Sequence, residues 1–187
     1  MRVISGKARG FKLKAVEGLD TRPTADRIKE NIFNILTPDL PGCRFLDLFS
    51  GTGAIGVEAL SRGAEYVVFV DNSPVAIETI KHNLDAVKLA DGATVLCMNF
   101  KLAIEWLVHE KLRFDIIYLD PPYDTGFAPE ALELIAGEGL LNDTGFVVAE
   151  LKRGAEFNRF GFEVYKSRNY GASSILFLRQ PREGVIA

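Results

Sequence analysis

Residues 46–56 read Leu-Asp-Leu-Phe-Ser-Gly-Thr-Gly-Ala-Ile-Gly, so an apolar run leads directly into three glycines. The run predicts a short buried strand over 44–48, and the residues after the glycines predict a helix over 54–62. Gly51, Gly53 and Gly56 have the GxGxxG spacing, in which missing Cβ atoms let a ligand approach the backbone between a strand and a helix. The stretch therefore predicts a nucleotide-type cofactor site at the carboxyl end of a strand.

The same strand-and-helix unit recurs toward the C-terminus, which predicts a doubly wound, mostly parallel α/β sheet. Two final strands lie only a few residues apart, which predicts an antiparallel hairpin. Further strands are predicted over 66–70, 94–97, 114–119, 146–151, 163–167 and 174–178, and helices over about 74–87, 101–109 and 129–137. Such a Rossmann-like seven-stranded sheet with a reversed last strand resembles that of class I S-adenosylmethionine-dependent methyltransferases.

The first 40 residues depart from this alternation. Residues 2–4 and 11–14 predict a basic β-hairpin, and Thr24 is expected to cap a helix. Apolar residues at helical spacing predict one buried face on that helix, made of Ile28, Ile32, Phe33 and Leu36. We expect residues 1–40 to be an extension that is not an independent domain, and residues 41–187 to be the methyltransferase domain.

Length and composition fit one ordinary folded domain. The chain has 187 residues, of which 48% are hydrophobic and 25% charged. Cys43 and Cys97 show no metal-ligand spacing, so reduced thiols and no metal site are expected. No signal peptide or apolar span is visible, which predicts a cytoplasmic protein without membrane contact.

The net charge of −3 conceals an uneven distribution. Residues 1–30 carry 8 Lys and Arg against 4 Asp and Glu, residues 31–151 carry 7 against 18, and residues 152–187 carry 7 against 3. Basic ends can bind phosphates if the fold places them on one face, whereas an acidic middle repels a polyanion. Termini that are only solvated account for the same charges, so composition leaves both interpretations open.

Two carboxylates distinguish between possible cofactors. Asp47 ends the first strand, where it would repel a dinucleotide pyrophosphate but favour the ammonium and sulfonium of S-adenosyl-L-methionine. Asp71 ends the next strand and can accept hydrogen bonds from two ribose hydroxyls. Asn99 fits an acceptor for the adenine amine and also a helix N-cap, and the two are compatible. With S-adenosyl-L-methionine as the expected cofactor, the predicted binding residues are Asp47, Ser50, Gly51, Gly53, Asp71, Asn99 and Phe100.

The second motif, Asp120-Pro121-Pro122-Tyr123, follows the strand predicted over 114–119. An amine on a nucleobase is a poor nucleophile because its lone pair is delocalised into the ring. The Asp120 carboxylate and the Pro121 carbonyl can each accept one N–H and so turn the lone pair toward a methyl donor, while Pro122 stiffens the turn. Tyr123 offers a ring face on which an extruded base can stack. These four residues are the predicted catalytic residues.

Three stretches carry a resemblance to a known family: the segment 21–34, TRPTADRIKENIFN, residues 47–64, and DPPY. The chain resembles the RsmD family of 16S rRNA (guanine-N2) methyltransferases along nearly its whole length. The resemblance implies methylation of the exocyclic 2-amino group of a guanine in 16S rRNA, on an assembled or partly assembled small ribosomal subunit. It also implies that Arg22, Thr24 and Arg27 border the pocket, with both arginines binding RNA. The hairpin is expected to bind RNA through Arg2, Lys7, Arg9, Lys12 and Lys14.

Three other functions compete with this interpretation. DPPY also suits an adenine-N6 methyltransferase acting on DNA or RNA, although such enzymes usually carry a larger target-recognition domain. An NAD-dependent oxidoreductase would explain the glycines and Asp71 but neither Asp47 nor DPPY. A non-catalytic RNA-binding module would use the basic ends and leave DPPY unexplained.

Overall fold

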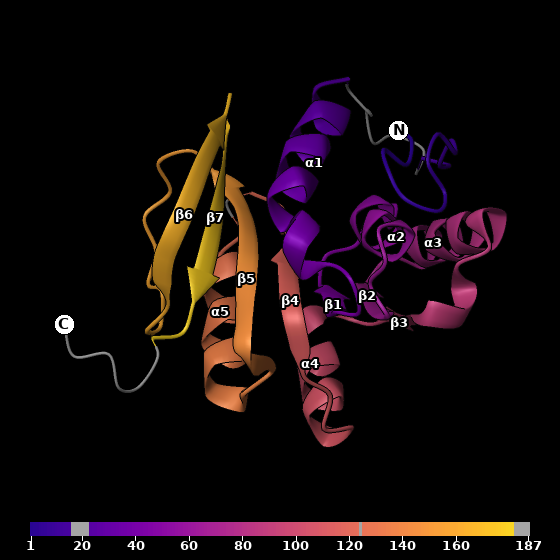
Figure 1. The fold of residues 1–187 in the computed structure, drawn as a ribbon. Helices are drawn as coiled ribbons and strands as arrows, with labels where there is room; N and C mark the ends of the chain where they lie inside the picture. Colours follow the sequence, from indigo (N-terminus) through magenta and orange to yellow (C-terminus); the bar gives the residue numbers. More distant parts are fainter. Residues whose placement is uncertain (16–22, 124, 182–187) are drawn as a thin grey trace. The chain divides into compact units, whose positions relative to one another are not determined.

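The computed structural model describes residues 1–15, 23–123 and 125–181. By internal contacts the chain divides into two compact units, Met1–Ala103 and Ile104–Ala187. Its seven strands belong to one mostly parallel α/β sheet with an antiparallel C-terminal pair, which confirms the predicted fold class (Figure 1). No helix within the described ranges is long and apolar enough to cross a membrane.

The first unit contains three parallel strands in the order β3-β2-β1. Their bounds are β1 Arg44–Asp47, β2 Tyr66–Asp71 and β3 Ala93–Cys97, each within one residue of the prediction. Val67, Val68, Phe69 and Val70 are all fully buried, as expected for a parallel strand covered on both faces. Helices α2 (Ala54–Ser61) and α3 (Pro74–Val87) contact these strands and each other (Figure 1).

Local sequence explains where these helices begin and end. Ser73 caps α3 by accepting a hydrogen bond from Ala76 N, and Pro74 takes the first helical position, where its missing N–H costs nothing. Gly63 follows α2 with φ of 106°, in the region that glycine adopts most easily. Helix α4 (Phe100–His109) begins one residue before the prediction, and two short 3-10 turns, Thr37–Asp39 and Ala90–Gly92, complete this part of the chain.

The N-terminal segment differs from the prediction in two details. The expected hairpin over 2–4 and 11–14 has its antiparallel turn, but the pairing is a single bridge between Arg2 and Lys12 without regular strands. Helix α1 spans Pro23–Leu36, so Thr24 lies inside the first turn and not at the cap. Proline at the first helical position accounts for the earlier start. The predicted apolar face is largely confirmed, because Ile32, Phe33 and Leu36 are buried.

The second unit contains four strands in the order β4-β5-β7-β6. Strands β4 (Phe114–Leu119) and β5 (Leu141–Lys152) are parallel, whereas β7 (Ser173–Arg179) pairs antiparallel with β5 and with β6 (Glu163–Tyr170). The predicted final hairpin is therefore confirmed. Helix α5 (Phe127–Glu138) contacts β5 and buries Ala131, Leu132 and Ile135.

Candidate functional site

The glycine loop after β1 provides an open backbone surface. Gly51 and Gly53 have φ of 53° and 76°, which side-chain-bearing residues rarely adopt. A Cβ at Gly51 would meet nothing within 4 Å, so the loop leaves free space beside its backbone. A Cβ at Gly56 would overlap the Phe69 ring, so this glycine permits close packing of α2 on β2. This division of roles fits a loop that cradles a ligand.

Asp47 lies at the end of β1 with its side chain only 1% exposed. Its Oδ2 accepts a hydrogen bond from Gly56 N at 3.0 Å, so the carboxylate caps the first turn of α2 from a neighbouring strand. Burial raises the pKa of Asp47 to about 7, and the negative charge of Asp71 acts in the same direction, while the Gly56 amide opposes them. A carboxylate this costly to ionise would gain from a cationic ligand nearby.

Asp71 and Ser50 fasten the loop to the end of β2. Asp71 accepts hydrogen bonds from Gly51 N at 2.8 Å and from Ser73 N at 2.9 Å, one on each oxygen. Each oxygen retains a further lone pair, so ribose hydroxyls can still be accepted. The buried Ser50 hydroxyl donates to Asp47 O and accepts from Val70 N. Ser50 therefore shapes the loop from within.

Asn99 adopts the capping role that its sequence context allowed. Its Oδ1 accepts hydrogen bonds from Lys101 N and Leu102 N, both at 3.0 Å, at the start of α4. The next residue, Phe100, is buried, and its ring centroid lies 5.3 Å from that of Phe49. The aromatic pair gives the first unit an apolar wall next to the strand ends that carry Asp47 and Asp71.

In the second unit, the DPPY motif directly follows β4. Asp120 is exposed, whereas Pro121 is buried. Thr125 Oγ1 donates to Pro122 O at 2.7 Å, which pins the turn beyond the motif. Tyr123 is 44% exposed, and its hydroxyl lies 2.7 Å from Ser173 Oγ at the start of β7. Burial raises the pKa of the Tyr123 phenol, and its hydrogen bond with Ser173 opposes that shift.

A groove of about 210 Å³ adjoins this turn. Pro121, Pro122 and Tyr123 form one side of it, the first turn of α5 another, and residues 151–157 a third. The lining combines prolines and aromatic rings with a few polar side chains, a combination common in small-molecule sites. The groove brings together three of the four predicted catalytic residues.

The five basic residues predicted in the N-terminal segment, Arg2, Lys7, Arg9, Lys12 and Lys14, are all exposed. The apolar residues between them, Val3, Ala8 and Leu13, are buried, so the segment turns its charges outward. Phe11 is 46% exposed among these charges, and the sequence analysis missed it. An aromatic residue interleaved with basic ones is the signal that could have identified it. Arg27 is also exposed, whereas Arg22 lies outside the described residues, as does the side chain of Thr24.

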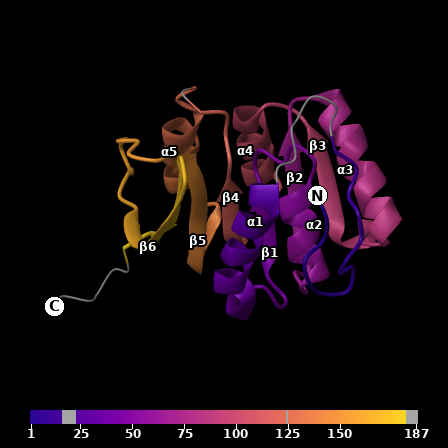
Figure 2. The same ribbon diagram turned by 90° about the horizontal axis from the view of Figure 1, so that it is seen from above.

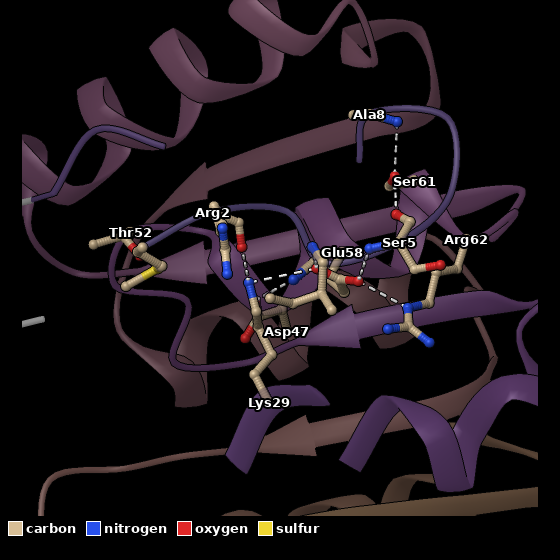
Figure 3. A network of polar contacts seen from close by, with 12 residues as sticks. Arg2, Ser5, Ala8, Lys29, Asp47, Thr52, Glu58, Ser61 and Arg62 are labelled. Atoms are coloured by element: carbon tan, nitrogen blue, oxygen red, sulfur yellow. Dashed lines mark hydrogen bonds and ion pairs between the residues drawn. The ribbon is translucent and has the colours of Figure 1, made fainter. Parts of the chain in front are cut away.

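Glu58 in α2 anchors this segment, although it is completely buried (Figure 3). Its two oxygens accept hydrogen bonds from Ile4 N and Ser5 N at 2.8 and 3.0 Å. Lys29 Nζ and Arg62 Nε lie 3.4 and 2.8 Å from the same carboxylate. Burial lowers the pKa of Lys29, and Glu58 opposes that shift. The basic segment is thus held along α2, as Figure 2 also shows.

Comparison with known proteins agrees with this geometry. The sequence profile of a family described as "Conserved hypothetical protein 95" matches residues 1–179. YlbH of Bacillus subtilis (strain 168) is 40% identical over 182 residues, which are 96% of this chain and 99% of that protein. Ribosomal RNA small subunit methyltransferase D of Escherichia coli (strain K12) is 33% identical over 150 residues, 80% of this chain and 74% of that protein. The solved structure of yhhF from Escherichia coli has a TM-score of 0.83 at 29% identity and covers 97% of this chain and 99% of that chain.

Proposed function

Because this chain belongs to the RsmD family of 16S rRNA methyltransferases, we propose that it methylates the exocyclic 2-amino group of a guanine in 16S rRNA. The observation that carries the proposal is the placement of Asp120–Tyr123 directly after β4, next to a groove that the motif itself lines. An adenine-N6 methyltransferase is not favoured, because the curated relatives that match most of this chain include ribosomal RNA small subunit methyltransferase D from two species.

The residues of the glycine loop fit S-adenosyl-L-methionine. Gly51 leaves room beside the backbone, Asp71 has lone pairs for two ribose hydroxyls, and the buried Asp47 favours a positive charge. When bound, this cofactor supplies an electrophilic methyl group on a sulfonium. The Phe49–Phe100 pair offers an apolar surface for the adenine ring, and Asn99 stabilises the start of α4 beside it.

The catalytic loop then orients the amine. Asp120 and the Pro121 carbonyl each accept one N–H of the guanine 2-amino group, so that the nitrogen lone pair is available to accept a methyl group. The nitrogen would then accept the methyl group that the cofactor, held by the glycine loop, would supply. The methylated nitrogen, now cationic, loses a proton to solvent. Tyr123 supports the base from its exposed ring face.

The basic N-terminal segment holds the substrate. Its five exposed cations neutralise phosphates, and Phe11 offers a stacking surface for an unpaired base. Since Glu58 fixes the backbone of Ile4 and Ser5, the segment is ordered before RNA arrives, and binding pays less ordering entropy. The proposed partner is therefore 16S rRNA, either free or in an assembling small subunit.

Methyl transfer tests the proposal directly. Small subunits from cells that lack this protein are incubated with it and with S-adenosyl-L-methionine labelled in the methyl group, and the RNA is then digested to nucleosides. We expect N2-methylguanosine. N6-methyladenosine would redirect the assignment to adenine, and labelled protein without labelled RNA would overturn the rRNA substrate.

A further inference from the structure

A second groove, of about 450 Å³, lies beside the groove of the catalytic loop in the second unit. One wall is the irregular segment 154–159, and the other is a face formed by β5, β6 and β7. The two grooves have five lining residues in common, Leu151, Lys152, Ala155, Glu156 and Phe157. An extended ligand that leaves the groove of the catalytic loop would therefore pass directly into the second groove.

The chain segment that forms this groove carries an excess of positive charge. From residue 152 to residue 181 the chain carries six Lys or Arg residues against Glu156 and Glu163. Lys152 and Arg159 line the groove itself and are exposed, and Glu156 is the one carboxylate among its described lining residues. Ser167 and Ser174 contribute hydroxyls to the strand wall. Such a lining suits an anion that can also accept hydrogen bonds.

Size and composition identify the class of ligand. A volume of about 450 Å³ exceeds what one planar base needs and is suited to a nucleotide with its phosphate. Half-buried Phe157, which lines both grooves, provides an aromatic ring where an unstacked base can rest. Cations that track a backbone beside aromatic rings are the usual means of holding single-stranded RNA.

We propose that this groove binds the single-stranded RNA that continues from the target guanosine, with Arg159 and Lys152 contacting its phosphates. The inference rests on the proposed function, because it takes the DPPY groove as the place of the target base. It adds a second RNA contact on the other compact unit, separate from the N-terminal basic segment. Two separate contacts with the RNA then explain the excess of basic residues in both terminal parts of the protein.

Arg159→Ala and Arg153→Ala form a matched pair for the test. Both arginines are exposed, both lie in the connection between β5 and β6, and each substitution removes one positive charge, but only Arg159 lines the groove. We expect Arg159→Ala to raise KM for small subunits about tenfold with little change in kcat. The slope of the logarithm of affinity against the logarithm of salt concentration should decrease in magnitude by about one, because one phosphate contact is lost. Arg159→Lys should restore most of the affinity, and Arg153→Ala should resemble the wild type.

Two further measurements complete the experiment: the affinity for protein-free 16S rRNA and the affinity for the cofactor. If RNA occupies the groove, Arg159→Ala weakens binding to protein-free 16S rRNA as well, while the affinity for S-adenosyl-L-methionine stays unchanged. A defect seen with subunits but absent with naked RNA would overturn the proposal in favour of a ribosomal protein. Equal effects of Arg159→Ala and Arg153→Ala would also overturn it. Failure of the wild-type protein to methylate RNA would instead refute the proposed function, and this inference with it.

Discussion

Asn83 holds the backbone of Lys14 at both polar groups: Lys14 N donates to Asn83 Oδ1 at 2.8 Å, and Asn83 Nδ2 donates to Lys14 O at 3.1 Å. The same Nδ2 also donates to Thr52 O at 3.0 Å. One side chain of α3, only 1% exposed, therefore joins the basic segment to the glycine loop. The groups proposed to bind RNA and cofactor are thus connected through a single amide.

Asn83→Ala should loosen the basic segment and destabilise the fold. Three hydrogen bonds are lost, and at about 1 kcal/mol each they predict a loss of about 3 kcal/mol in the free energy of unfolding. That corresponds to a fall in Tm of roughly 6–12 °C. Thermal unfolding measures it, with Asn34→Ala at an exposed position of α1 as the control. A change in Tm no larger than that of the control would contradict this role of Asn83.

Charge reversal in the basic segment should weaken RNA binding. In Lys12→Glu with Lys14→Glu, two exposed cations become anions that repel phosphates. We expect affinity for 16S rRNA to fall at least tenfold and the salt slope to decrease by about two. Titration at several salt concentrations measures both quantities. Lys81→Glu with Lys111→Glu makes the same change at exposed lysines elsewhere, and an equal loss there would show that net charge alone is responsible.

Asp120→Ala should reduce turnover by about 100-fold or more, because the amine loses an acceptor that orients it in the transition state. Since Asp120 is exposed, folding and cofactor affinity should change little. Single-turnover methyl transfer and calorimetric titration with S-adenosyl-L-methionine separate the two effects. Asp143→Ala removes another exposed carboxylate of the same unit and should leave turnover intact. Loss of both turnover and cofactor binding in Asp120→Ala would point to a structural role.

The Tyr123–Ser173 contact should orient the aromatic ring. Tyr123→Phe and Ser173→Ala each remove the same 2.7 Å hydrogen bond, so we expect similar increases of a few-fold in KM for RNA. The double variant should be no worse than either single one. Tyr123→Ala also removes base stacking, which is worth roughly 1–3 kcal/mol, and should be clearly worse. Additive effects of Tyr123→Phe and Ser173→Ala in steady-state kinetics would show that the two hydroxyls act independently.

The raised pKa of Asp47 predicts a specific dependence on pH. Its folded-state pKa of about 7 lies above the ordinary value of 3.8, so between these values the folded protein keeps a proton that the unfolded chain has released. The Asp47 contribution to stability is therefore greatest at low pH and falls as pH rises from about 4 to 7. Thermal unfolding of Asp47→Asn should lack this component. An unchanged pH profile in Asp47→Asn would rule out Asp47 as its source.

Cofactor binding should also depend on the protonation state of Asp47. A cationic ligand favours the ionised carboxylate, so binding near pH 7 should release a proton from Asp47. Calorimetry in two buffers of different ionisation enthalpy measures the released proton, which should be absent in Asp47→Asn. Equal proton release by both proteins would place the effect on another residue.

Several elements could be predicted because their signals are local. Strands buried on both faces appear as continuous apolar runs, so β1, β2 and β4 were located within one residue. Strand β5 was expected only from Phe146, yet it begins at Leu141. The three residues after Leu141 are polar, and the pairing of β5 opposite β4 includes a hydrogen bond from Asn142 Nδ2 to Asp115 Oδ1. No pattern within residues 141–145 predicts that they pair with β4.

The residues of the candidate site also include some that the sequence could identify and some that it could not. Residues at the carboxyl ends of parallel strands could be named from the order of strands and turns, and their binding roles stay predictions. Glu58 and Ser173 could not be named, because each acquires its role from a residue more than 45 positions away. A charged residue in a short helix or a serine at the start of a strand has no distinctive local pattern. Long-range contacts of this kind become visible only in the folded chain.

The anchoring of the basic segment on α2 also governs its exchange of amide hydrogens with solvent. Ile4 N and Ser5 N donate to the buried Glu58 carboxylate, while Lys7 N and Ala8 N donate to Ser61 O and Oγ. These amides lie outside any helix or strand but can exchange only when their contacts with α2 open. We therefore expect this stretch, which has no regular secondary structure, to exchange as slowly as the core, and its protection factors to report the integrity of a helix more than 50 residues further along the chain.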